Sequence, residues 1–214
     1  MEVKSSKRVG RPRSFNQDQA LNRAMHVFWK KGYEGASLHD LTAAMGIQPA
    51  SLYAAFGNKQ AVFEQALTRY LAGPAAYMHA ALEEPTAYAV AERTLCRTAE
   101  LLAGRRGRHG CMTIQAALVG SEETEAIRRK LTRLRLREQN ALRRRFERAK
   151  DEGDLPERAD ATGLADFITT VFQGMTVQAI NGARRQELLR IAKTALRAWP
   201  GRTERATALH HRSQ

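Results

Sequence analysis

The sequence predicts an all-α protein, and three observations indicate this fold class. Ala, Leu, Arg, Glu and Gln, which favour helices, dominate the 214 residues. Apolar residues recur at intervals of three and four, whereas the two-residue alternation of a β-strand is never sustained. Gly and Pro divide these helical patterns into short segments near the N-terminus and longer segments after residue 70. We therefore expect a unit of short helices followed by a unit of longer ones.

Composition divides the chain into four parts. The N-terminal residues are rich in Lys and Arg, and Gly10 and Pro12 among them oppose a regular helix. The C-terminal residues are polar and follow Pro200, which ends the last helical pattern. We expect a basic flexible arm over 1–14, a compact set of short helices over 15–70, longer helices over 71–200 and a frayed polar tail over 201–214.

Charge and cysteine content restrict the classes of protein. Lys and Arg number 35 against 22 Asp and Glu, so the formal net charge is +13, which favours an anionic partner such as nucleic acid. No apolar run of about 18 residues predicts a transmembrane helix, and no apolar stretch follows the basic N-terminus as in a secretory signal. Cys96 and Cys111 are too few for a disulfide scaffold. We expect a cytoplasmic protein with no membrane partner.

The first helix is expected to begin after Asn16. Asn is a good N-cap residue, and Gln19 three positions later can complete a capping box. Apolar side chains then fall on one helical face, at Ala20, Leu21, Ala24, Val27 and Phe28. Gly32 follows Lys30 and Lys31, which suit a helix C-terminus, so we expect the helix to end there.

A second helix is predicted from the capping box that Ser37 and Asp40 form, and Gly46 is expected to end it. Pro is favoured at the first position of a helix, so Pro49 predicts a short third helix over 49–55. Later helices are expected from Asn58 to Tyr70, over 121–153 with Ser121 as its cap, over 161–180 and over 186–199.

Two short helices joined by a tight glycine-containing turn, with a third helix before them, are typical of the helix-turn-helix motif. In that motif the second helix of the pair lies in the major groove of DNA, and its N-terminal residues contact base edges. Here Gln48 and Ser51 offer hydrogen-bonding groups for bases, and Ala50 is small enough to permit close approach. The alternative is that the three helices pack together without any role in DNA binding.

These residues resemble the DNA-binding domain of the TetR/AcrR repressors over about residues 10–65. The resemblance is carried by Gly10-Arg11-Pro12-Arg13, Ala24–Phe28, Gly32-Tyr33, Ser37-Leu38-x-x-Leu41, Gly46-Ile47, Ser51-Leu52-Tyr53-x-x-Phe56 and Lys59. It implies an N-terminal three-helix helix-turn-helix DNA-binding domain and a helical C-terminal domain for ligand binding and dimerisation. It also implies a homodimer whose recognition helices enter successive major grooves of a palindromic operator in double-stranded DNA, released by a small-molecule effector of unknown identity.

The resemblance also assigns roles to residues. Tyr53 matches a tyrosine that contacts a phosphate, and Lys59 matches a lysine that meets the DNA backbone at the start of the fourth helix. A helix N-terminus with a lysine is physically suited to a phosphate. Ser37 matches a residue that caps the second helix and touches phosphate. Gln48 and Ser51 occupy variable positions that contact bases.

The arm and the start of the third helix complete the expected DNA-binding residues. Arg11 and Arg13 belong to an arm that can lie along phosphates or enter the minor groove, although a solvated tail is the alternative. Pro49 and Ala50 are placed in the DNA-binding set, but they depart from the commonest family pattern. The sequence therefore predicts no particular operator.

The last two predicted helices, over 161–180 and 186–199, are apolar on wide faces. In the resembled family such helices form a four-helix interface between two subunits. We therefore expect an interface made by Phe172, Met175, Leu189 and Leu196. The alternative is that both helices only complete the core of their own subunit.

Ten of the Lys and Arg side chains in the predicted helix over 121–153 lie around an apolar stripe. They are Arg128, Arg129, Lys130, Arg133, Arg135, Arg137, Arg143, Arg144, Arg145 and Arg148. We interpret them as a solvated face whose long stems cover apolar surface. A second anion-binding surface, for nucleic acid or membrane, is the alternative.

Cys111 is a possible sensing thiol. It follows Gly110 at the expected start of a helix, and Arg105, Arg106 and Arg108 lie nearby, so we expect a lowered thiol pKa. A buried structural cysteine is the alternative. His109 beside Cys111 suggests neither a metal site nor a catalytic pair, because further ligands and an orienting third residue are missing.

The sequence thus predicts a transcriptional regulator, more specifically a repressor released by a small molecule or by thiol modification. We expect no enzyme activity, catalytic residue, metal or cofactor. The rival hypothesis is a DNA-coating protein, whose charge of +13 would give tight binding without sequence preference.

Overall fold

The computed structural model describes residues 15–104, 110–114 and 124–200, and within these ranges it contains helices and no strand. The all-α prediction is confirmed. The helices are α1 (Gln17–Gly35), α2 (Leu38–Met45), α3 (Pro49–Phe56), α4 (Lys59–Ala72), α5 (Ala76–Ala81), α6 (Ala87–Ala103), α8 (Glu125–Asp151), α9 (Ala161–Ile180) and α10 (Arg185–Arg197). None of these helices is both long and apolar enough to cross a membrane. The expected arm and tail, with Arg11 and Arg13, lie outside the described residues.

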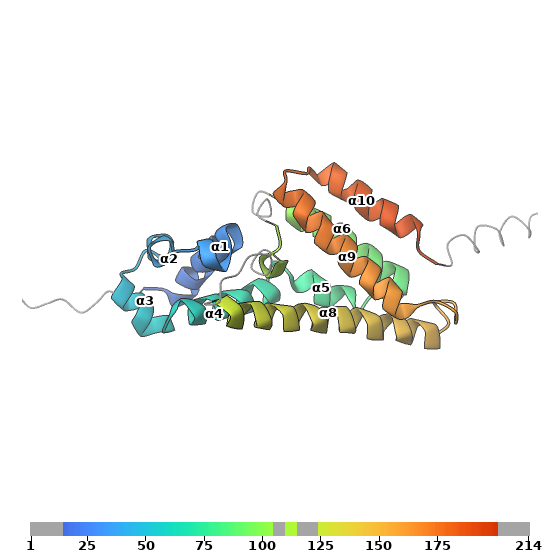
Figure 1. Cartoon of the computed structure of the whole chain (residues 1–214), viewed down its shortest axis with the longest axis horizontal. Helices are drawn as coiled ribbons and strands as arrows, with labels where there is room; N and C mark the ends of the chain where they lie inside the picture. Colours follow the sequence, from blue (N-terminus) through green and yellow to red (C-terminus); the bar gives the residue numbers. More distant parts are fainter. Residues whose placement is uncertain (1–14, 105–109, 115–123, 201–214) are drawn as a thin grey trace, which may run out of the picture.

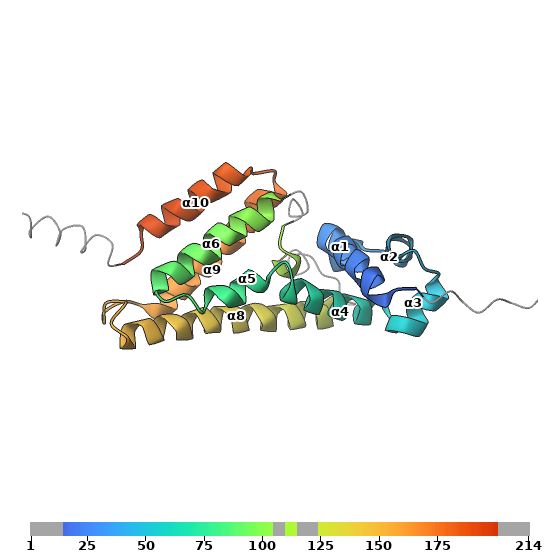
Figure 2. The same ribbon diagram turned by 180° about the vertical axis from the view of Figure 1, so that it is seen from behind.

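Helices α1, α2 and α3 gather at one end of an elongated molecule (Figure 1). Helix α4 leads from them toward the other end, and α5 continues in the same direction. Helix α8 runs alongside α4 and α5 and packs against α9, while α6, α9 and α10 pack together, as the reverse view also shows (Figure 2). The N-terminal unit, α1 to α4, and the C-terminal unit, α5 to α10, therefore meet where α4 lies beside α8.

Capping residues fix the ends of the N-terminal helices largely as predicted. Asn16 caps α1 by accepting a hydrogen bond from the Gln19 backbone at 3.0 Å. Gly32 has a φ of +70°, which a residue with a side chain rarely adopts, and it interrupts α1 before a final turn that reaches Gly35. The predicted helix end at Gly32 is thus a kink within a longer helical segment.

The turn between α2 and α3 also follows the prediction. Ser37 and Asp40 form the reciprocal capping box, with two bonds of 3.0 Å. Gly46 ends α2 in the left-handed conformation, and Pro49 is the first residue of α3. Asn58 caps α4 by accepting from the Ala61 backbone at 2.8 Å. The short connection at Gly46 sets the angle at which α3 leaves α2.

The N-terminal helices share a buried core of large side chains. The largest of these fully buried side chains are Phe28, Leu41, Leu52, Phe63 and Tyr70. Phe28 meets Phe63 edge to face, with ring centroids 5.1 Å apart. This core holds α3 by its Leu52 side and leaves the opposite side of α3 at the surface.

Helices α8, α9 and α10 match the predicted spans closely, but the side chains that they expose differ from those predicted. Helix α9 has the predicted bounds, whereas the described part of α8 begins at Glu125, and Ser121 lies outside the described residues. Phe172, Met175 and Leu196, which we expected at a subunit interface, are only 5%, 0% and 3% exposed. That expectation is wrong for these three, because their side chains already pack within their own subunit. Leu189 is half-buried.

Arg145 also differs from its prediction as part of a solvated face. Its side chain is buried, and its guanidinium donates hydrogen bonds to the carbonyls of Leu82, Glu84 and Pro85 at 3.2, 2.8 and 3.1 Å. These carbonyls lie between α5 and α6. The buried charge therefore fixes the connection between these helices onto α8.

Replacing Arg145 with Met should destabilise the protein by roughly 2–4 kcal/mol, because the carbonyls of Leu82, Glu84 and Pro85 lose a buried, charged donor. Urea unfolding followed by circular dichroism measures this change. Arg143→Met, on the exposed side of the same helix, is the matched control and should change the unfolding free energy by no more than about 0.5 kcal/mol. Equal stability of the two variants would contradict this role of Arg145.

Candidate DNA-binding site and its connections

Helix α3 presents one face to the surface. Leu52 and Phe56 are buried, whereas Tyr53, one position from Leu52, is 49% exposed. Gln48, Pro49 and Ala50 are also accessible, and Ser51 is half-buried. Most of the residues expected on α3 therefore lie on its accessible side, at its N-terminal end.

The N-terminus of α3 has groups available for a ligand. Gln48 occupies the N-cap position, but its side chain makes no capping hydrogen bond. Pro49 carries no backbone N–H, and the Ser51 backbone N–H already donates to the Gln48 carbonyl at 2.9 Å. The backbone donor left at this end, among the described residues, is therefore that of Ala50. The positive end of the helix dipole and the Gln48 amide together suit an anionic or hydrogen-bonding surface such as a DNA groove.

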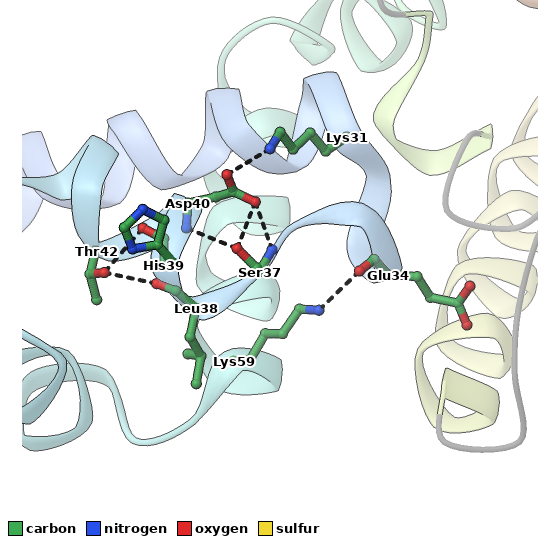
Figure 3. Close-up of polar contacts among 8 residues, drawn as sticks. All are labelled: Lys31, Glu34, Ser37, Leu38, His39, Asp40, Thr42 and Lys59. Carbon is green, nitrogen blue, oxygen red and sulfur yellow. Dashed lines mark hydrogen bonds and ion pairs between the residues drawn. The ribbon is translucent and has the colours of Figure 1, made fainter.

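Ser37 is held more tightly than the sequence suggested (Figure 3). Its hydroxyl donates to the Asp40 carboxylate at 2.7 Å, and Lys31 binds the other oxygen of that carboxylate at 2.6 Å. Hydrogen bonds from Lys31 and Ser37 lower the pKa of Asp40 well below its usual range. The Ser37 hydroxyl has only one hydrogen, so donation to a phosphate would require its bond to Asp40 to break. The sequence did not predict the pairing of Lys31 with Asp40.

Lys59 lies at the first position of α4 and reaches back toward the end of α1 (Figure 3). Its ammonium lies 3.5 Å from the Glu34 carbonyl and 4.6 Å from the centre of the Tyr33 ring. Burial lowers the pKa of Lys59. These contacts fix the side chain near the surface that carries Ser37, and the predicted phosphate contact of Lys59 remains a prediction.

A buried junction connects the DNA-binding helices to residues 110–114. The indole N–H of Trp29, in α1, donates to the Gly110 carbonyl at 2.6 Å. The hydroxyl of Tyr70, in α4, donates to the sulfur of Cys111 at 3.5 Å. The Trp29 and Tyr70 rings meet edge to face at 5.0 Å. The sequence pattern does not reveal this junction, because its bonded partners are 81 and 41 residues apart.

Two polar contacts join the same helices to α8. The hydroxyl of Thr124 donates to the Glu34 carboxylate at 2.9 Å. The ammonium of Lys130 pairs with the Glu64 carboxylate of α4 at 2.8 Å. Both ends of the N-terminal unit, α1 and α4, therefore touch the beginning of α8.

Cys111 lies next to this junction in a different environment from the one predicted. It is only 4% exposed, and burial raises the pKa of its thiol. The hydroxyl of Thr113 lies 3.1 Å from the sulfur. The expectation of a lowered thiol pKa is therefore wrong, because loss of hydration outweighs the hydrogen bonds that favour the thiolate. The arginines on which that expectation relied lie outside the described residues, as does His109.

Across the part of the chain that the structure describes, no group of three or more His, Cys, Asp or Glu side chains could hold a metal ion. The described residues instead provide an exposed face on α3, which can bind another molecule. They also provide a buried junction, which connects the N-terminal helices to the remaining helices.

Two family models match the chain. Residues 20–66 match the model described as bacterial regulatory proteins, tetR family, and residues 92–196 match the tetracyclin repressor-like C-terminal domain. The first range contains α2, α3 and most of α1 and α4. The second contains α8, α9 and most of α6 and α10.

Individual relatives agree with these models. The chain is 34% identical to the HTH-type transcriptional repressor ComR of Escherichia coli (strain K12) over 200 residues, which are 92% of this chain and 94% of that protein. It is 29% identical to the repressor BdcR of the same strain, over 91% of this chain and 95% of that one.

Among solved structures, the chain resembles the TetR family transcriptional regulator CifR, as a cysteine mutant complexed with 26-bp double-strand operator DNA. The two are 43% identical with a TM-score of 0.84, over 89% of this chain and 100% of that one. The described helices have the arrangement of that regulator along nearly its whole length. This chain belongs to the TetR family of bacterial regulatory proteins.

Proposed function

We propose that this protein is a transcriptional repressor that binds an operator as a homodimer and is released by a small-molecule effector or by thiol modification. The observation that carries the proposal is the exposed N-terminal face of α3, held on a buried core by Leu52 and Phe56. The 43% identity to CifR, whose structure contains operator DNA, supports the same use of that face.

In this proposal, α3 lies in the major groove. Gln48 and Ser51 bond to base edges, Pro49 and Ala50 allow close approach, and Tyr53 bonds to a phosphate. Arg11 and Arg13 of the N-terminal arm add contacts to phosphates or to the minor groove. Ser37 and Lys59 lie beside the DNA backbone, in the positions that their contacts with Asp40 and Glu34 fix.

Two copies are needed to place two α3 helices one DNA turn apart, at about 34 Å. Helix α9 offers the surface for this pairing, because Phe167, Val177 and Ile180 remain 40%, 41% and 41% exposed. Positions 167, 170, 174 and 177 recur at intervals of three and four and so share one helical face, and Gly174 on this face permits close helix approach. Ile191 of α10 is also exposed. The interface that we propose therefore contains these exposed residues of α9 and α10, and not the buried Phe172, Met175 and Leu196.

The buried junction supplies the proposed coupling to DNA. Trp29 and Tyr70 belong to the N-terminal unit, and both bond to residues 110–111. A change at residues 110–114, or a shift of α8 acting through Lys130 and Glu64, therefore acts directly on α1 and α4. An effector that favours one arrangement shifts the population of dimers that match successive grooves, and a coupling of about 1–3 kcal/mol gives useful induction.

The decisive experiment is selection from a random duplex library at about 0.15 M salt, followed by sequencing of the retained DNA. We expect a two-fold symmetric motif. Tight binding at low salt without any enriched motif would instead favour a DNA-coating protein, whose affinity comes from its charge of +13 alone.

On the selected duplex, Gln48→Ala should cost about 1–3 kcal/mol and relax the preference at one base position, because a base contact is lost. Tyr53→Phe should weaken binding to every sequence equally, because a phosphate contact is lost. Fluorescence anisotropy with the duplex and its single-base variants measures both effects. Gln186→Ala, at the exposed start of α10, is the control and should bind as the unchanged protein does.

Phe167→Glu should convert the dimer to monomer in sedimentation velocity experiments, because it places charges at the centre of an apolar interface. Leu136→Glu is the matched control, since Leu136 is an exposed apolar residue on α8, outside the proposed interface. If the Phe167 variant remained dimeric at the same concentration, this face of α9 would not form the interface.

Alkylation of Cys111 by iodoacetamide should be slow at pH 7 and should accelerate up to and beyond pH 9, because the thiolate is the nucleophile and burial raises the thiol pKa. The adduct breaks the contact with Tyr70, so we expect weaker operator binding. Mass spectrometry and anisotropy of the same samples measure both quantities. Cys96→Ser protein isolates the effect of Cys111, and an adduct on Cys111 that left operator affinity unchanged would exclude this thiol as a sensor.

A further inference from the structure

A cleft of about 470 Å³ lies where α5 passes α8, which both views show side by side (Figures 1 and 2). Its walls are mostly apolar and come from the end of α4, from α5 and from the middle of α8. The apolar side chains are Leu71, Ala75, Met78, Leu82, Leu134, Ala141 and Leu142. The volume is within the usual range for sites that hold small organic molecules.

One carboxyl group interrupts these apolar walls. Glu138 of α8 lines the cleft and also lines a narrow recess of about 20 Å³ beside it, toward Ile168 and Phe172 of α9. Glu138 makes no hydrogen bond or ion pair with any other described residue. Arg135, one turn earlier, directs its guanidinium instead to the Thr113 carbonyl at 3.1 Å and the Thr132 hydroxyl at 3.0 Å. A polar group placed in the cleft would therefore find Glu138 without a partner.

Burial raises the pKa of Glu138 to about 7, and Arg135 opposes this rise only in part. At neutral pH a large fraction of Glu138 is therefore the neutral acid, which donates a hydrogen bond. Burial also keeps the nearby Tyr77 hydroxyl and Cys111 thiol protonated. Helices α6 and α9 add the uncharged Thr94 and Gln173, while the remaining ionisable side chains of the cleft are His79, Arg137 and Arg144.

We propose that this cleft binds an uncharged, mostly apolar effector that carries a hydrogen-bond-accepting oxygen, and that the Glu138 carboxyl donates the hydrogen bond to it. The inference rests on the proposed function, since it identifies the chemistry of the effector. The basic Arg137 and Arg144 disfavour a cationic ligand in the same cleft, and the fraction of Glu138 that is ionised at neutral pH disfavours an anionic one. A ligand with an accepting oxygen on an apolar body can accept a hydrogen bond from the Glu138 carboxyl group and make apolar contacts with the cleft walls.

The same helix connects the cleft to the DNA-binding unit. Glu138 lies about two turns along α8 from Lys130, which pairs with Glu64 of α4. Leu71, at the opposite wall of the cleft, belongs to α4 itself. A molecule that separates α5 from α8 therefore displaces two helices that contact α4.

Isothermal titration calorimetry of the full chain without DNA tests the proposal, with 2-octanone, octylammonium and octanoate as probes of equal chain length. We expect 2-octanone to bind most tightly, with an affinity that falls roughly tenfold or more between pH 6 and pH 8.5 as Glu138 ionises. Tightest binding of octylammonium, with affinity rising over the same range, would overturn the assignment and indicate a cation site.

Two substitutions separate the role of Glu138 from general packing. Glu138→Gln keeps a hydrogen-bond donor that does not titrate, so it should bind 2-octanone at every pH about as tightly as the unchanged protein does at pH 6. Glu138→Leu should lose affinity roughly tenfold at pH 6. Glu147→Gln, at an exposed carboxyl of α8, is the control and should retain the full pH dependence. A pH dependence that persists in Glu138→Gln would overturn the proposal.

Loss of the predicted probe order, with symmetric operator binding intact, removes only the role of Glu138. Absence of sequence-specific DNA binding removes the proposed repressor function, while calorimetry still decides what the cleft binds.

Discussion

The indole N–H of Trp29 is the polar group on which the relation between the two units depends. Trp29 is buried in the core that holds α3 in place, and a buried N–H needs an acceptor. Its acceptor is the carbonyl of Gly110, outside the N-terminal unit. The DNA-binding core is therefore complete only when residues 110–114 are in place beside it, which makes its position sensitive to the C-terminal helices.

Helix α8 connects the N-terminal unit to the other helices along much of its length. Its beginning contacts α1 and α4 through Thr124 and Lys130, its middle lines the cleft at Glu138, and its later part holds the α5–α6 connection through Arg145. A basic helix that the sequence marks as a solvated face thus has three structural contacts on its inner side.

Local signals explain how much of the structure could be predicted. Caps such as Asn16, Ser37 and Asn58 act within three residues, so they locate helix ends without any knowledge of the fold. The exposed set on α3 follows from the same local pattern.

Contacts between distant segments explain what could not be predicted. The environment of Cys111, the burial of Arg145 and the pairing of Trp29 with Gly110 all depend on segments far apart in sequence. Periodicity also could not distinguish the apolar face of α9 that packs inward at Phe172 from the one left exposed at Phe167.

Gly110 links three segments through one small residue. Its carbonyl holds Trp29 of α1, its φ is +77°, and a β-carbon at this position would lie 2.8 Å from the Ile180 side chain of α9. A larger residue at 110 would therefore need both a strained backbone and a smaller residue at 180. Because Ile180 is also on the surface proposed for subunit pairing, this close packing joins that surface to the segment that accepts the Trp29 hydrogen bond.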